Sequence, residues 1–171
     1  IGVNTMVNND KLTAYVGSQD VSAGEDIMKY MIDYMKKDAF NIVVIEGPMG
    51  QSAQLQRMEG IENVLKDYPD IQILAKNTAN WSRSEAMTLM ETWITTYGDD
   101  IDAVVSENDE MALGAREAIE AQNMDIPCIG IDGITDAVAA VESGKMIASD
   151  FQNAEGQITG ALETAVKCVN N

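Results

Sequence analysis

Five polar or aromatic side chains stand at comparable places in this sequence, just after a predicted strand or within two turns of the following helix. They are Arg57, Trp81, Asn108, Asp132 and Gln152. The guanidinium, the carboxylate and the two carboxamides offer both hydrogen-bond donors and acceptors, which suits neighbouring hydroxyl groups of a small molecule. The indole face can lie against the C–H face of a sugar ring.

Each of these residues also has a purely structural interpretation. Arg57 could form a surface ion pair with Glu46 or Glu59, and Trp81 could anchor its loop. Asn108 could be a helix N-cap, Asp132 could serve a turn before Gly133, and Gln152 could simply be solvated. If the five residues converge on one rim of a sheet, five separate structural roles explain that convergence less well than a shared binding site does. No two of them form a nucleophile and its base, so the set favours recognition over catalysis.

The chain contains no histidine, which removes histidine-based catalysis and metal ligation. No calcium-loop pattern of the D-x-D-x-D-G type occurs either. We therefore expect no catalytic residue, no metal site and no cofactor. The loop from Gly47 to Ser52 has the placement of a phosphate-binding loop but lacks the Walker spacing and lysine, so its glycines instead indicate a tight turn.

A repeated strand–loop–helix unit must position these side chains, and it is clearest in residues 101–115. There the apolar run from Ile101 to Val105 ends in four polar residues, and apolar residues at helical spacing follow. Ligands bind at the carboxyl ends of strands in open α/β sheets. Further apolar runs occupy residues 1–3, 14–17, 41–45, 71–75, 126–131 and 146–148. This alternation predicts an α/β fold of three αβα layers around a mostly parallel, doubly wound sheet.

Local signals indicate how the helices begin and which faces they bury. Ser52 is the expected N-cap of one helix, and Ser82 or Ser84 that of the next. Asp109 and Glu110 are assigned to the start of their helix, where negative charge is favoured. The helix after Ser52 is expected to use one face made of Leu55, Met58, Ile61 and Leu65.

Composition limits the classes of partner. The chain of 171 residues has a net charge of −17, with 11 basic and 28 acidic residues, which argues against nucleic acid. No apolar run approaches the length of about 20 residues that crosses a bilayer. Cys128, in an apolar strand, and Cys168, near the end of a helix, are both expected to be buried and inert, and a disulfide between them stays open.

Four segments carry a resemblance to a known family. They are E-G-P-x-G-x-S-A-x-x-x-R-x-x-G (46–60), N-D-E-M-A-L-G-A (108–115), G-x-D-G (130–133) and A-x-x-x-Q (148–152). They closely resemble the ribose-binding-protein-like (type 1) periplasmic sugar-binding proteins, the solute receptors of bacterial ABC importers. The resemblance runs through most of the chain, and the string that begins at Asn108 is its most specific part.

The resemblance implies two α/β lobes, joined by hinge strands, that close on a sugar. Residues 1–17 would end the first lobe and form a hinge strand, residues 18–152 would be the second, sugar-binding lobe, and residues 153–171 a helix that returns to the first lobe. The hydrogen-bonding ligand contacts would be Arg57, Asn108, Asp132 and Gln152. Trp81 would be the aromatic residue that packs on the sugar.

The implied protein is not an enzyme but the solute-binding component of an ABC importer, which takes a monosaccharide or polyol and delivers it to a membrane permease. It would be extracytoplasmic, in the periplasm or as a cell-surface lipoprotein. The alternative is the ligand-sensing domain of a lactose-repressor-type transcriptional regulator, which shares the fold.

The chain departs from the family in three respects. Where the family usually has an acidic or amide residue followed by arginine, this chain has Asn4 and Thr5, so Asn4 is a candidate contact but a strong charged contact is missing. A Ser-Gln-Asp triplet at 18–20 replaces the family's frequent Ser-Asp-Asn. Nearly all of the first lobe is missing, so we expect a fragment that binds sugar weakly. The face of its last helix formed by Ile158, Leu162, Ala165, Val166 and Val169 would lack its parent sheet and is expected to pack against something else, for which a second copy is one candidate.

Overall fold

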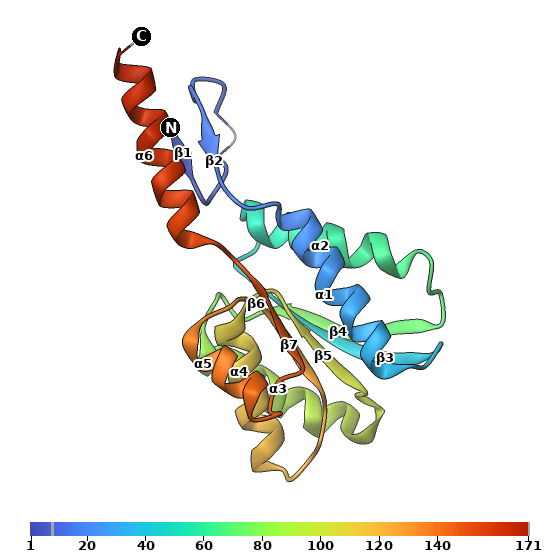
Figure 1. The fold of residues 1–171 in the computed structure, drawn as a ribbon. Helices are drawn as coiled ribbons and strands as arrows, with labels where there is room; N and C mark the ends of the chain where they lie inside the picture. The colour runs from blue at the N-terminus through green and yellow to red at the C-terminus, as the bar shows by residue number, and fades with distance from the viewer. Residues whose placement is uncertain (8, 171) are drawn as a thin grey trace.

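The computed structural model describes residues 1–7 and 9–170 of the chain. It contains a five-stranded sheet with helices on both faces and a smaller part in which two short strands lie beside the last helix (Figure 1). The strands are β1 (Gly2–Val3), β2 (Tyr15–Val16), β3 (Phe40–Glu46), β4 (Ile71–Thr78), β5 (Ala103–Ser106), β6 (Cys128–Asp132) and β7 (Ala148–Phe151). The helices are α1 (Asp20–Met35), α2 (Ser52–Leu65), α3 (Arg83–Tyr97), α4 (Asp109–Ala121), α5 (Thr135–Glu142) and α6 (Ala154–Asn170), with a 3-10 turn, η1 (Gly98–Asp100).

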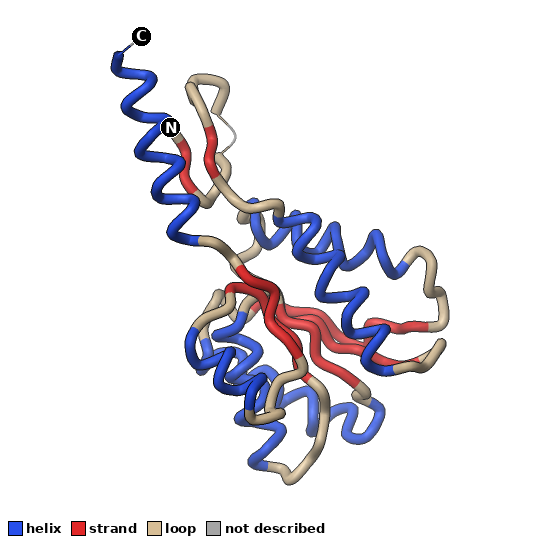
Figure 2. The backbone as a smooth tube through the Cα atoms, viewed as in Figure 1, coloured by secondary structure: helices blue, strands red, loops and turns tan. Residues whose placement is uncertain are grey.

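The main sheet has the strand order β4-β3-β5-β6-β7, and every neighbouring pair is parallel. Strand β4, which follows β3 in the chain, pairs with one side of β3, and β5 pairs with the other side. The loops that follow β3 and β5 therefore lead to opposite sides, and the sheet has its topological switch point between these two strands. Helices α1 and α2 cover one face and α3, α4 and α5 cover the other, with the strands between them (Figure 2). The predicted three-layer, doubly wound α/β fold is confirmed.

Alternating side chains of the strands divide the core between the two faces. In β3, Ile42 and Val44 pack in the cluster with α1 and α2, whereas Val43 and Ile45 pack in the cluster with α3 and α4. All four are 0% exposed. A parallel strand covered on both faces needs such a continuous apolar run, because successive side chains point to opposite sides.

Glycines bring α1 and α2 into backbone contact. A Cβ atom on Gly24 would lie 2.1 Å from the carbonyl oxygen of Arg57, and one on Gly60 would lie 2.1 Å from that of Val21. No larger residue fits at either position without moving a helix. This close approach holds Arg57 against the first turn of α1.

Several local predictions were wrong, and one was confirmed. The N-cap of α2 is Gln51, and the hydroxyl of Ser52 instead accepts a hydrogen bond of 3.0 Å from the Met6 amide. Leu55 is 55% exposed, because it lies on the solvent-facing side of α2 with Glu59 and Glu62, whereas the preceding residue, Gln54, is buried. Ser82 caps α3 as predicted, accepting from the Glu85 amide.

The two cysteines are free, and only Cys128 is buried. Cys168 is exposed, contrary to the prediction, because α6 lies beside β1 and β2 rather than on the main sheet (Figure 1). The outer side of α6 therefore exposes apolar residues, namely Ile158, Leu162, Val166 and Val169. Among the described residues, no helix has the length and apolar character that crossing a membrane requires.

Glu107, in the loop between β5 and α4, has a buried carboxyl group, and its two oxygens differ in their hydrogen bonding. Oε2 accepts a hydrogen bond of 2.7 Å from the Gly47 amide, which ties this loop to the one after β3. Oε1 has no hydrogen-bond partner within the described part of the chain. Burial, with help from the negative charge of Glu46, raises the pKa of Glu107 to about 8, against the opposing effects of the Gly47 amide, Arg57 and Lys76.

This raised pKa predicts a pH-dependent stability. The folded chain holds the Glu107 proton more tightly than the unfolded chain, so the resulting stabilisation is complete below the ordinary glutamate pKa and is lost as the pH rises through about 8. Glu107→Gln keeps an acceptor for the Gly47 amide but carries no titrating proton. Relative to the unsubstituted chain, we expect this variant to gain about 4–5 kcal/mol in unfolding free energy between pH 4 and pH 9.

Urea denaturation at several pH values measures this difference. Glu107→Ala is the matched control, since it also removes the titrating group but leaves the Gly47 amide without its acceptor, and it should be less stable than Glu107→Gln at every pH. A constant difference between Glu107→Gln and the unsubstituted chain across this pH range would contradict the raised pKa.

Candidate functional site

A pocket of about 330 Å³ lies at the carboxyl edge of the main sheet, beside the two residues that follow β1. The side chains that line it come from the ends of strands, from the loops that follow them and from the start of α2. They are Asn4, Thr5, Gln51, Ala53, Arg57, Trp81, Asn108, Asp132 and Gln152. The structure thus brings together all six residues singled out in the sequence, and adds Thr5, Gln51 and Ala53, which the sequence reasoning missed.

Arg57 is the buried centre of this site, with only 4% of its surface exposed. Its Nε donates a hydrogen bond of 3.0 Å to Asp20 Oδ1 in the first turn of α1, and its Nη1 donates to the main-chain carbonyl of Glu107. Nη1 also lies 3.9 Å from Asp132 Oδ1. A buried guanidinium needs such partners because desolvation of its charge is costly. Arg57 is therefore not a surface residue paired with Glu46 or Glu59.

Trp81, in the loop between β4 and α3, is held from several sides. The guanidinium carbon of Arg57 lies 5.6 Å from the centroid of its ring, which is a cation–π geometry. Its Nε1 donates a hydrogen bond of 2.9 Å to Gln51 Oε1. A Cβ atom on Gly47 would lie 2.1 Å from the indole, so the ring packs directly on the loop after β3.

Asn108 combines a structural role with free hydrogen-bonding capacity at the pocket. It is the N-cap of α4, and its Oδ1 accepts a hydrogen bond of 3.0 Å from the Met111 amide. The capping role considered from the sequence is thus correct. The cap uses only the carbonyl oxygen of the carboxamide, and Nδ2 donates no hydrogen bond to any residue that the structure describes, so its two N–H groups can serve another partner at the pocket.

Asp132, the last residue of β6, is a half-buried carboxyl beside Arg57. Burial raises its pKa to about 6; Arg57 opposes this shift, whereas the negative charges of Asp109, Asp20 and Glu110 add to it. The carboxylate therefore holds a proton more readily than an exposed aspartate, although it remains mostly ionised at neutral pH.

Three pocket residues have positive φ angles, which residues other than glycine usually avoid. The φ angles are +61° for Asn4, +62° for Trp81 and +131° for Asp132. Non-glycine residues in this region are strained, and such strain concentrates at ligand sites because the surrounding structure must hold it in place. The strained backbone is thus consistent with a site whose side chains are fixed before a ligand arrives.

Neighbouring acidic residues brace the site rather than line it. Asp109 is fully buried, accepts hydrogen bonds of 2.7 and 2.8 Å from the Ser149 hydroxyl, and accepts one of 3.0 Å from the Ile134 amide. Glu110 pairs with Arg83 at 2.7 Å. Both belong to the first turn of α4 as predicted, but Asp109 also joins α4 to β7 and to the loop after β6.

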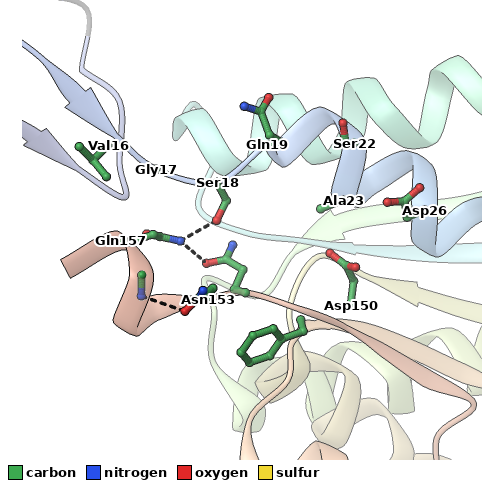
Figure 3. Close-up of a pocket in the computed structure, with 13 residues that line it drawn as sticks. Val16, Gly17, Ser18, Gln19, Ser22, Ala23, Asp26, Asp150, Asn153 and Gln157 are labelled. Carbon is green, nitrogen blue, oxygen red and sulfur yellow. Dashed lines mark hydrogen bonds between the residues drawn. The ribbon is translucent and has the colours of Figure 1, made fainter. Parts of the chain in front are cut away.

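Gln152 is shared by this pocket and by a second one of about 410 Å³, which lies between α1 and the start of α6 (Figure 3). Its Oε1 accepts a hydrogen bond of 3.5 Å from Gln157 Nε2, which also donates one of 2.6 Å to the Ser18 hydroxyl (Figure 3). Gln152 is thus partly buried where the chain passes between the main sheet and the part with β1, β2 and α6.

The chemistry of the lining favours neutral, hydroxyl-rich molecules. One guanidinium, one carboxylate and four carboxamides provide donors and acceptors around one indole. Asp20 already compensates the charge of Arg57. No group of three or more potential metal ligands occurs among the described residues.

Comparison with known proteins identifies the family of the chain. The sequence profile of the periplasmic binding protein domain matches residues 1–171. The chain is 42% identical over 166 residues to the xylitol-binding protein of Mycolicibacterium smegmatis, covering 96% of this chain and 47% of that protein. It is 34% identical over 164 residues to the ribose import binding protein of Bacillus subtilis, covering 96% and 52% of the two chains.

A solved structure gives the same result. An ABC transporter solute-binding protein from Bacillus halodurans, crystallised with bound myo-inositol, superposes with a TM-score of 0.93 at 35% identity. The match covers 99% of this chain and 59% of that one. The chain thus spans about half the length of the curated relatives it matches. It belongs to the periplasmic binding protein domain family.

Proposed function

We propose that this chain forms one wall of the sugar site in the solute-binding component of a bacterial ABC importer. The observation that carries the proposal is the convergence of Arg57, Trp81, Asn108, Asp132 and Gln152 on one pocket. Relatives named for xylitol and ribose binding, and a structural neighbour with bound myo-inositol, support a ligand of the monosaccharide or polyol class. Asn4 completes the set from the side of β1.

The proposed domain division follows the arrangement of the elements. Residues 18–152 form the second lobe, which contains the five-stranded sheet, and residues 1–17 and 153–171 belong to the first lobe and the hinge. In support, β1, β2 and α6 lie together at one end of the molecule, and the chain passes between them and the main sheet before α1 and after β7 (Figure 1). In this proposal a ligand lies between the lobes, which close on it and exclude water.

The charges of the site favour a neutral ligand. Arg57 is neutralised by Asp20, so Asp132 leaves the pocket slightly negative, and a sugar acid or sugar phosphate would be repelled. The carboxamides of Asn4, Asn108 and Gln152 suit hydroxyl groups, which both donate and accept.

Binding rather than turnover is proposed for this site, because the lining offers no nucleophile paired with a base. The protein would work outside the cytoplasm, in the periplasm or as a cell-surface lipoprotein, and deliver its ligand to a membrane permease. The relatives described above are binding proteins of this kind, so a role as a regulator's sensing domain is not proposed.

Asp132 provides the experiment that tests this function. Its carboxylate would accept hydrogen bonds from ligand hydroxyls, so Asp132→Asn in a form of the protein with both lobes should lose about 1.5–3 kcal/mol of binding free energy. Affinity of the unsubstituted protein should fall as the pH drops through about 6, because protonation removes the negative charge and turns one accepting oxygen into a donor, and Asp132→Asn should abolish this pH dependence.

Calorimetry from pH 5 to pH 8 with xylitol, D-ribose, D-allose and myo-inositol measures both effects. Trp81→Ala is the matched control: it should weaken binding yet keep the same pH dependence. An Asp132→Asn affinity within twofold of the unsubstituted protein at pH 8 would remove Asp132 from the site.

The exposed face of α6 leads to a separate proposal for the isolated chain of 171 residues. Ile158, Leu162, Val166 and Val169 are 59–85% exposed, and burying them against a second copy would remove apolar surface from water. Sedimentation velocity should therefore detect concentration-dependent dimers. The double substitution of Leu162→Asn and Val166→Asn should abolish them, whereas Glu163→Gln, on the same helix, should not. A monomer at every concentration would refute this self-association.

A further inference from the structure

Gln51 is a pocket residue to which neither the resemblance nor the sequence pattern assigns a role. It precedes α2 as its N-cap and lines the pocket together with Trp81 and Arg57. The loop that carries it is firmly held: the Gly50 amide donates to Gln54 Oε1 at 2.9 Å, and Gln54 Nε2 donates to Glu46 Oε1 at 2.9 Å. The backbone of Gln51 therefore starts from a fixed position.

The orientation of the Gln51 carboxamide follows from chemistry. The indole N–H of Trp81 is a donor only, so the group 2.9 Å from it must be the amide oxygen of Gln51 and not its NH₂. The bond to Trp81 is the only hydrogen bond of the Gln51 side chain among the described residues. Two N–H donors of Gln51 thus remain at the pocket with no protein partner in that part of the chain.

We infer that Gln51 is a specificity-determining residue, which donates an N–H hydrogen bond to a ligand oxygen on the Trp81 side of the pocket. The Asp132 carboxylate, which also lines the pocket, only accepts, so the two residues together select a ligand that offers both an accepting oxygen and a donating hydroxyl. This inference rests on the proposed sugar-binding function.

A double-substitution cycle separates a ligand contact from a role in holding the indole. Gln51→Met removes the carboxamide at similar size, and Trp81→Phe removes the indole N–H but keeps an aromatic ring. Affinities are measured by calorimetry on the two-lobe protein with xylitol, D-ribose, D-allose and myo-inositol. Circular dichroism and thermal unfolding without ligand check that each variant folds, which the exposed position of Gln51 favours.

If Gln51 contacts the ligand, Gln51→Met should weaken binding about fivefold both in the unsubstituted protein and in the Trp81→Phe background. The effect should also differ between the four probes, which changes their order of affinity. An effect that vanishes in the Trp81→Phe background would mean that Gln51 only positions the indole, and affinities within twofold for all probes would exclude any role; either result overturns the inference alone. Failure of the unsubstituted protein to bind any probe would instead overturn the proposed function.

Discussion

The buried guanidinium of Arg57 is the interaction on which the rest of the site depends. It joins α2 to the first turn of α1 through Asp20 and to the loop after β5 through the Glu107 carbonyl, and it lies against Asp132 and the Trp81 ring. A charge removed from water must find partners on every side, so each of these elements is held in one position. The glycine contacts between α1 and α2 permit this arrangement, because only bare backbone lets the helices approach closely enough.

The pocket around Arg57 forms because the strands of the sheet are parallel. Its strands end at one edge, so the residues that follow β4, β5, β6 and β7 meet there although they are distant in sequence. Strained backbone at Trp81 and Asp132 directs side chains that regular turns would place elsewhere. Gln152 belongs both to this pocket and to the crossing toward α6, where Gln157 connects it to Ser18. A ligand that contacts Gln152 would therefore also touch the connection between the two parts of the molecule.

Much of this could be predicted from the sequence, for a physical reason. Buried parallel strands require continuous apolar runs such as residues 41–45, and the topology then decides where the residues beyond each strand end lie. Long-range pairings could not be predicted: Arg57 meets Asp20 over 37 positions and Asp109 meets Ser149 over 40. Helical periodicity likewise identified most of the buried face of α2 but not that Leu55 lies on its exposed side. The place of Gln51 in the pocket lining was missed because the glycines of its loop indicated only a turn.

The central claim is that this chain is one wall of a two-lobed cleft for a neutral sugar or polyol, and one calorimetric comparison tests it most directly. The chain of 171 residues and a form extended to the length of its relatives are titrated with xylitol, D-ribose, D-allose and myo-inositol. The account predicts that the extended form binds at least one of them, whereas the shorter chain shows no heat of binding at micromolar ligand, because half a cleft cannot enclose the ligand. Equally tight binding by both forms, or no binding by the extended form, would contradict it.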